Sequence, residues 1–171
     1  RQRQMCIRDR ANVQPLDFIP MRRSIARVPS PTAASTGNWP MVHGVGDRWY
    51  AKPDAGAWLI SPCEEHPMHP HDAFADDMVL AEGIDRYSKM VNHEITSLQT
   101  SWAGLRTFSQ DHALVIGFDK STKDFFWFAG QGGYGFQTAP AASQLASELI
   151  LSNATSLAKA TVEALSPKRF D

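Results

Sequence analysis

The sequence predicts an α+β fold, and three features along the chain support this prediction. Short stretches of strand composition separated by turn residues fill positions 39–61, which is typical of a β-meander. Apolar residues then recur with a 3.6-residue period over positions 75–91, which predicts an amphipathic helix. Finally, the apolar run at 125–129 has strand length and leads through several glycines into a second helix.

Each element has its own local signal. Strand composition is found at residues 15–28, 39–45, 48–52, 57–61, 95–108, 114–117 and 125–129. Turn residues at 44–47 and 53–56 separate the early strands, and residues 29–38 and 62–74 form loops rich in proline. The second helix begins at about Thr138, and a short third helix covers 156–165. The apolar face of the second helix comprises Ala142, Leu145, Ala146, Leu149 and Ile150.

The composition is that of an ordinary globular chain. Its 171 residues, 43% hydrophobic and 20% charged, suffice for one domain with a sizeable core. A net charge of -1 gives no electrostatic signature of nucleic-acid or anionic-membrane binding. Two cysteines, Cys6 and Cys63, are too few for a disulfide framework, and no apolar run has the length of a membrane helix. We therefore expect a cytoplasmic location, with peripheral attachment to the inner membrane as the alternative.

The first ten residues, RQRQMCIRDR, differ from the rest of the chain. They show neither helical nor strand periodicity and carry a cluster of arginines. We interpret them as translated adapter sequence or the result of truncation. The alternatives are a disordered basic tail and a genuine segment from inside a longer protein. Residues 1–10 are therefore left out of the fold prediction, and residues 11–171 are treated as one domain.

The most informative stretch is the glycine-rich segment GQGGYGFQ at 130–137, which lies between a strand and a helix. Glycines let the backbone approach a ligand closely, and a helix N-terminus offers N–H groups to a partly negative group. Gly130, Gly132 and Gly135 match G-x-G-x-x-G. The acidic residue expected about 20 positions later in a strand is missing, so this is not a dinucleotide-binding fingerprint. The alternative reading is a glycine loop used only for packing.

Two further residues are candidates for ligand binding. Arg106 lies among small and apolar residues in TSWAGLRTF, where a charge needs a partner, and a guanidinium can bind a carboxylate through two hydrogen bonds. A structural ion pair would explain Arg106 equally well. Strand alternation places Tyr50 and Lys52 on one face and Trp49 and Ala51 on the other. By itself, Tyr50 is more typical of a core or edge tyrosine than of a ligand contact.

Taken together, the segments WPMV, RWYAKPDAG, SWAGLRTF, FFWFAGQGGYGFQT and LSPKRF resemble, in that order, the D-amino-acid oxidase family of flavoproteins. The resemblance covers about residues 15–169 and is closest to the branch that contains the D-arginine dehydrogenases. It implies an α+β substrate domain with a mixed or antiparallel sheet, in the C-terminal half of a two-domain FAD-dependent oxidoreductase. The N-terminal Rossmann-like half, which binds the ADP part of FAD, is missing from this sequence and is the expected partner.

The resemblance also implies a reaction and a set of site residues. FAD accepts a hydride from the α-carbon of a D-amino acid, the imino acid hydrolyses to a 2-oxo acid and ammonium, and no side chain serves as a catalytic base. Arg106 binds the substrate carboxylate, Arg23 faces the same group (with Arg22 as the register alternative), and the Tyr50 hydroxyl reaches it. Met41 forms an apolar wall, and the Gly133 carbonyl faces the substrate amine. The cofactor-binding residues implied are Gly130, Gln131, Gly132, Gly133, Tyr134, Gly135, Phe136 and Gln137.

Two alternative functions stay open at this point. A sarcosine- or glycine-type amine oxidase of the same family would share these motifs. A non-catalytic metal-binding or scaffolding domain could instead use the cluster Cys63, Glu64, Glu65, His66, His69 and His71. The prolines in this cluster force an extended chain, and no second pair of ligands is found elsewhere. We therefore predict no metal, a small amino-acid substrate, no nucleic-acid partner and no integral membrane segment.

Overall fold

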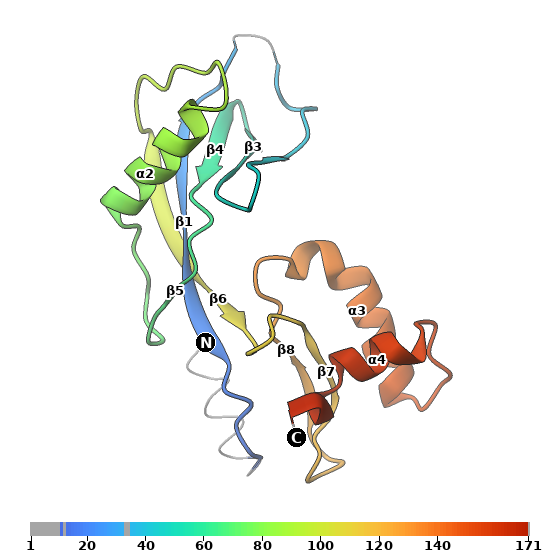
Figure 1. Ribbon diagram of the computed structural model, residues 1–171. Helices are drawn as coiled ribbons and strands as arrows, with labels where there is room; N and C mark the ends of the chain where they lie inside the picture. Colours follow the sequence, from blue (N-terminus) through green and yellow to red (C-terminus); the bar gives the residue numbers. More distant parts are fainter. Residues whose placement is uncertain (1–10, 12, 33–34, 171) are drawn as a thin grey trace. The chain divides into compact units, whose positions relative to one another are not determined.

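The computed structural model describes residues 11, 13–32 and 35–170, so the segment 1–10 lies outside the described residues. The chain divides into two compact units (Figure 1). One unit comprises Met21–Leu105, and the other combines the residues up to Pro20 with those from Arg106 onward. Each unit is described by itself below.

A sheet of six strands is the main element of the unit Met21–Leu105. Its order is β2-β3-β4-β1-β5, and β6 also pairs with β1. The pairs β1–β4, β1–β5, β2–β3 and β3–β4 are antiparallel, and β2–β3–β4 form the meander that the sequence predicted over positions 39–61. The strands are β1 (Ile19–Pro29), β2 (Val42–His43), β3 (Tyr50–Asp54), β4 (Ala57–Ser61), β5 (His66–Pro67) and β6 (Thr100–Phe108).

The hairpin between β3 and β4 is tighter than the sequence predicted. Its loop consists of Ala55 and Gly56 alone, with φ of 44° and 79°. Two consecutive positive φ angles are the signature of a type I′ turn, whose twist matches that of the flanking strands. Pro53 and Asp54, predicted as turn residues, are instead paired with Trp58 and Ala57. The strand predicted at 39–45 is also shorter, since only Val42–His43 are paired.

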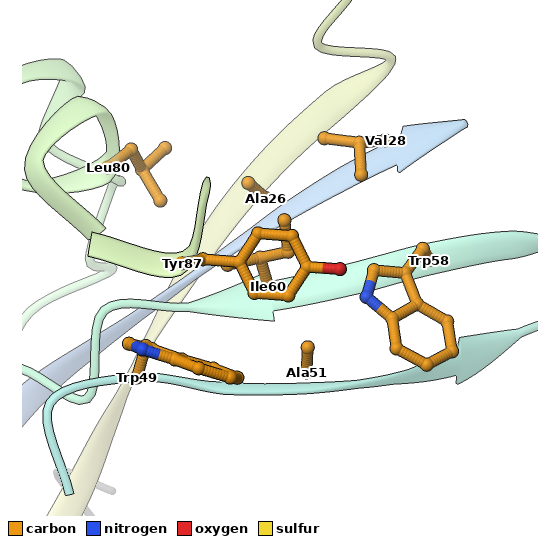
Figure 2. Packing of buried hydrophobic residues seen from close by; sticks show 8 residues of the cluster. All are labelled: Ala26, Val28, Trp49, Ala51, Trp58, Ile60, Leu80 and Tyr87. Atoms are coloured by element: carbon orange, nitrogen blue, oxygen red, sulfur yellow. The ribbon is translucent and has the colours of Figure 1, made fainter. Parts of the chain in front are cut away.

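The core of this unit lies between one face of the sheet and helix α2 (Asp77–Ser88), as Figure 2 shows. Leu80 and Tyr87 of the helix pack against the strands, as expected from the 3.6-residue apolar period over positions 75–91. Asp76 caps the helix by accepting hydrogen bonds from two backbone N–H groups in the first turn, so the helix starts later than the predicted residue 75. The buried cluster consists of Ala26, Val28, Trp49, Ala51, Trp58, Ile60, Leu80 and Tyr87.

The second unit is built around the hairpin of β7 (Val115–Phe118) and β8 (Phe126–Ala129). One face of the hairpin packs Val115 and Trp127 against Leu16, while the other packs Ile116 against Leu145 of helix α3 (Gly135–Ile150). Because both faces of the hairpin are packed, β8 lies in a continuous apolar run of the sequence, at positions 125–129. The chain continues through α4 (Lys159–Leu165) and the 3₁₀ helix η1 (Pro167–Phe170).

Helix α3 begins earlier than the sequence predicted. Its first residue is Gly135, whereas the predicted start was about Thr138. The last three residues of the glycine segment therefore form the first turn of the helix. Within the described ranges, no helix is both long and apolar enough to cross a membrane.

Candidate functional site

The residues singled out in the sequence are distributed over both units, and the glycine segment 130–137 belongs to the second. Gly130 and Gly132 have φ of 73° and 52°, in the left-handed region that favours glycine. The N–H of Gly132 donates a 2.9 Å hydrogen bond to the carbonyl of Thr107. A Cβ on Gly132 would lie 2.6 Å from Cε1 of Phe108. The loop therefore rests directly on the Phe108 ring.

Phe108 is the buried support of this loop. Its ring centroid lies 4.7 Å from that of His112 and 6.4 Å from that of Tyr134, the second contact being edge-to-face. No sequence motif connected Phe108 or His112 with the glycine segment. The feature that could have indicated the contact is the polar turn between the two apolar strands, because this turn brings residues 108–112 back towards the loop. We infer that the Phe108 ring determines where the backbone of the glycine loop lies.

The first turn of α3 leaves polar groups available. Tyr134 occupies the N-cap position and makes no side-chain capping hydrogen bond. The first N–H groups of any α-helix lack partners within the helix, so those of Gly135 and Phe136 need an acceptor from outside it. The Phe136 side chain is 99% exposed. The loop and helix start thus present backbone N–H groups beside an exposed aromatic ring.

Arg106 lies on β6, between buried Leu105 and half-buried Thr107. Its side chain is exposed, so the charge reaches solvent and is not held in the interior by an acid. In the part of the chain that the structure describes, the side chain of Arg106 makes no ion pair and no hydrogen bond. The nearest acid in the sequence, Asp111, is bound instead by Arg169, with Nε 2.6 Å from Oδ2. The guanidinium of Arg106 is therefore available to a ligand.

Arg23 and Arg22 lie on β1 in the first unit, and both contact acidic residues. Arg23 donates from Nε to the carbonyl of Glu64 at 3.0 Å and from Nη2 to the carboxylate of Glu65 at 2.8 Å. Arg22 lies 3.5 Å from Asp76 and 3.9 Å from buried Glu64. The sequence analysis connected none of these three acids with the arginines, although two adjacent glutamates just after a strand were a visible signal.

Tyr50 and Lys52 share one face of β3, and Ala51 on the other face is fully buried in the core cluster, as strand alternation predicted. The ring of Tyr50 lies 5.7 Å from that of His43, its partner on β2. Met41, the predicted apolar wall, is exposed next to β2. All of these residues belong to the unit Met21–Leu105.

The loop rich in histidine and proline does not form a metal site in the described residues. No group of three or more His, Cys, Asp or Glu side chains among them is arranged to hold a metal ion. His66 lies on β5, where its Nδ1 is 3.2 Å from Nη2 of Arg22. Burial raises the pKa of the Cys63 thiol to about 11, so the thiol is protonated at neutral pH and is a poor metal ligand.

Comparison with known proteins identifies the protein family. Residues 6–149 match the family described as FAD dependent oxidoreductase (DAO). This match covers most of the chain, so the chain belongs to that family.

Similar solved structures share the fold. Glycine oxidase from Geobacillus kaustophilus matches with a TM-score of 0.72 and 19% identity over 95% of this chain and 42% of that chain. L-proline dehydrogenase from P. horikoshii matches with a TM-score of 0.69 and 21% identity, over 97% of this chain and 44% of that chain. L-amino acid deaminase from Proteus vulgaris matches with a TM-score of 0.70 and 14% identity, over 95% of this chain and 48% of that chain. The chain thus spans less than half the length of these proteins.

The glycine segment fits the cofactor that the family uses, which is FAD. Glycines 130 and 132 keep the loop backbone in a conformation that other residues rarely adopt, and a side chain on Gly132 would displace Phe108. The uncapped start of α3 suits the electron-rich carbonyl groups of a flavin ring. Residues 130–137 would therefore hold the ring end of FAD rather than its phosphates.

Proposed function

We propose that this chain forms the substrate-binding part of an enzyme that oxidises D-amino acids with FAD. The observation that carries the proposal is Arg106, an exposed guanidinium without an ion pair to any described residue, in a chain that belongs to an FAD-dependent oxidoreductase family. An arginine free of protein carboxylates can bind the carboxylate of an amino acid in two-pronged geometry. The complete protein would also contain the part that binds the ADP portion of FAD.

Arg22 and Arg23 lie on opposite faces of the sheet, and this difference favours Arg23 as the second arginine that binds the substrate. Arg22 alternates with Ala26 and Val28, whose side chains pack towards α2, and it contacts the N-cap residue of that helix. Arg23 therefore points to the opposite face. Tyr50 lies on this same opposite face, because its neighbour Ala51 belongs to the core cluster. A carboxylate ligand on that face can meet both Arg23 and Tyr50.

Each residue then has a role in binding and orienting the substrate. By the family resemblance, Arg106 and Arg23 would bind the carboxylate, the Tyr50 hydroxyl would donate to it, and Met41 would contact the side chain. The carbonyl of Gly133 accepts a hydrogen bond from the substrate amine and orients its lone pair. FAD, when bound, supplies the acceptor for the hydride that leaves the α-carbon. The substrate amine loses a proton, and water hydrolyses the resulting imino acid to a 2-oxo acid and ammonium.

The substrate preference is the finer part of this proposal. The order of motifs WPMV, RWYAKPDAG and SWAGLRTF resembles the D-arginine dehydrogenase branch, which supports a D-amino acid over glycine or sarcosine. The residues that select the substrate side chain in that family come largely from the other half of the enzyme. We therefore propose the reaction and the D configuration, and we propose no preference for D-arginine.

Anaerobic reduction of the bound flavin tests this function directly. The full-length protein, purified with FAD, is mixed with D-amino acids, their L enantiomers, glycine and sarcosine, and the loss of the oxidised flavin band is followed. We expect reduction by several D-amino acids and none by the L enantiomers. Reduction by glycine or sarcosine alone would establish the amine-oxidase alternative, and a protein that binds no FAD would contradict the proposal altogether.

A further inference from the structure

The end of β6 and the turn that follows it support the glycine segment at two points. A Cβ on Gly132 would lie 2.6 Å from Cε1 of Phe108, the last residue of β6. A Cβ on Gly130 would lie 3.4 Å from the carbonyl oxygen of Ala113 and 3.6 Å from the backbone nitrogen of Ser109. All of these residues belong to one compact unit. A displacement of the turn would therefore displace the glycine loop as well.

Arg169, in η1, binds the same turn. Its Nε donates to Oδ2 of Asp111 at 2.6 Å, and its Nη2 donates to Oδ1 of Asp111 at 2.9 Å and to the carbonyl of Ala113 at 3.0 Å. Nη1 donates to the carbonyl of Ser166 at 3.1 Å, so all three nitrogens of the guanidinium are used. The side chain of Arg169 is largely buried, so it is packed in the unit as well as hydrogen-bonded to it.

Asp111 links Arg169 to the residues that Gly130 contacts. Its Oδ1 also accepts hydrogen bonds from the hydroxyl of Ser109 at 2.9 Å and from the backbone N–H of Ala113 at 3.1 Å. Ser109 and Ala113 are the two residues of the turn whose backbone atoms lie against Gly130. An unbroken series of contacts thus leads from η1 to the glycine loop.

We propose that Arg169 is a positioning residue for the flavin. It fixes the turn on which Gly130 and Gly132 rest, and it thereby fixes where the loop backbone meets the ring of FAD. The inference rests on the part of the proposed function in which residues 130–137 hold the flavin ring. A binding site works only when the groups that surround its contact residues keep them in the productive geometry. Arg169 acts in this way, through the turn.

Loss of the Arg169 side chain should weaken flavin binding moderately. At metal sites, loss of a residue that orients a ligand lowers affinity by about 10- to 100-fold. The turn keeps its internal hydrogen bonds to Asp111, so we expect the lower end of that range, a rise of about tenfold in the dissociation constant of oxidised FAD. The reduced ring carries more negative charge and depends more on the N–H groups of the loop. Its binding should weaken by about a further tenfold, which lowers the reduction potential of a two-electron couple by about 30 mV.

Two variants of Arg169 and one matched control test the inference in the full-length protein. Arg169→Ala removes the contact with the turn, whereas Arg169→Lys keeps an ion pair with Asp111 but loses the paired hydrogen bonds. Asp119→Asn is the control. Asp119 is buried and accepts a 2.8 Å hydrogen bond from Nε1 of Trp127, in the turn at the opposite end of the β7–β8 hairpin from Gly130. This variant therefore weakens the same unit away from the glycine loop.

Three quantities are measured for each variant. Titration of the apoprotein with FAD gives the dissociation constant, and equilibration of the holoenzyme with a redox dye gives the reduction potential of the bound flavin. The melting temperature of the apoprotein measures the loss of fold separately. None of these measurements needs a substrate.

We expect Arg169→Ala to raise the dissociation constant about tenfold and to lower the potential by about 30 mV, with a smaller change of both in Arg169→Lys. Asp119→Asn should keep the wild-type dissociation constant and potential, although its apoprotein melts at a lower temperature. Wild-type values in Arg169→Ala, or an equal change in Asp119→Asn, would overturn the inference. If Arg169→Ala does not fold, wild-type values in Arg169→Lys would overturn it.

The proposed function can fail separately. A wild-type protein that binds FAD but is reduced by no D-amino acid would reject the proposed reaction, and the effect of Arg169 on the flavin would still be measurable. A wild-type protein that binds no FAD would reject the proposed function and the inference together.

Discussion

The guanidinium of Arg169 binds the carboxylate of Asp111 through two hydrogen bonds, Nε to Oδ2 at 2.6 Å and Nη2 to Oδ1 at 2.9 Å. Nη2 also donates to the carbonyl of Ala113 at 3.0 Å. These contacts join η1, near the end of the chain, to the turn between β6 and β7. They also explain why Asp111, although close to Arg106 in the sequence, does not neutralise it.

This pair should stabilise the fold. The side chain of Asp111 is 44% exposed, so solvent weakens the interaction, and we expect Asp111→Asn to lower the free energy of unfolding at pH 7 by about 1 kcal/mol. Hydrogen bonds from Arg169 hold the pKa of Asp111 well below its ordinary value of 3.8. In acid the folded chain therefore binds fewer protons than the unfolded chain, and the stabilisation is lost as the pH falls through the folded-state pKa.

Chemical denaturation at several pH values measures both effects. The difference in stability between wild type and Asp111→Asn should be constant above about pH 5 and should narrow below about pH 4. A difference that stays the same down to the lowest pH would show that Arg169 and Asp111 do not interact through charge. Asp124→Asn is a suitable control, because Asp124 is an exposed acid on the turn before β8.

The buried pair of Tyr87 and His93 predicts a second pH dependence, in the range of histidine titration. The Tyr87 hydroxyl lies 2.9 Å from Nδ1 of His93, and burial lowers the pKa of His93 below its ordinary value of 6.5. The folded state therefore favours the neutral ring. The stabilisation from neutral His93 is complete above pH 6.5 and is lost as the pH falls through the lower folded-state pKa.

We expect the free energy of unfolding to fall below pH 6.5 by at most about 1.4 kcal/mol per pH unit. His93→Gln can still form a hydrogen bond with the Tyr87 hydroxyl but does not titrate, so the variant should lack this slope. His69→Gln, in an exposed loop, should retain it. Identical slopes in wild type and His93→Gln would mean that another group causes the pH dependence.

The glycine segment allows a prediction that separates its structural from its ligand-binding role. Gly132→Ala forces a side chain into a left-handed conformation and against the Phe108 ring, 2.6 Å away. We expect a loss of about 2 kcal/mol in stability together with loss of flavin. Gly37→Ala, where φ is not in the left-handed region and the nearest atom lies 3.7 Å away, should leave both unchanged.

Gly133 should respond differently, since it is exposed. Gly133→Val places a branched side chain on the open side of the loop, where we expect the flavin and the substrate amine. Flavin content or turnover in the full-length enzyme should therefore fall while the melting temperature stays close to that of wild type. Normal flavin content together with normal turnover would show that this side of the loop does not face the ligand.

Local patterns in the sequence predicted most of the elements but not their long-range contacts. Alternation correctly assigned Tyr50 and Ala51 to opposite faces of β3, because the side-chain period of a strand is two. The start of α3 was placed too late, since glycine and the proline at 140 are poor helix residues. Packing of Ala142 and Leu145 on the β7–β8 hairpin outweighs that local preference.

The candidate site was only partly visible for a related reason. The contact between Arg23 and Glu65 joins residues 42 positions apart and depends on the pairing of β1 with β5, which comprises two residue pairs. A strand of two residues is too short to be predicted from periodicity in the sequence. The apolar sequence neighbours of Arg106 likewise left open whether it pairs with an acid, reaches solvent or binds an anion, and alternation along β6 exposes its side chain next to buried Leu105. Sequence reasoning identified the candidate residues, and the structure supplied their partners.

Arg106 gives the most direct test of the substrate site. A two-pronged, charge-assisted contact to a substrate carboxylate is worth about 2–5 kcal/mol when one partner is truncated. Arg106→Ala in the full-length enzyme should therefore lower kcat/KM for D-amino acids by about two to three orders of magnitude. Arg106→Lys should recover only part of this, because an ammonium group cannot make the two parallel hydrogen bonds.

Fold and flavin content should stay nearly unchanged in both variants, since Arg106 makes no ion pair with the described residues whose loss could destabilise them. Arg48→Ala is the matched control, because Arg48 is an exposed arginine outside the proposed site, and its kcat/KM should equal that of wild type. Steady-state kinetics, flavin absorbance and thermal unfolding of the three variants decide the matter. If Arg106→Ala loses its flavin or unfolds while its remaining active fraction keeps a normal KM, then Arg106 has a structural role and does not bind the substrate carboxylate.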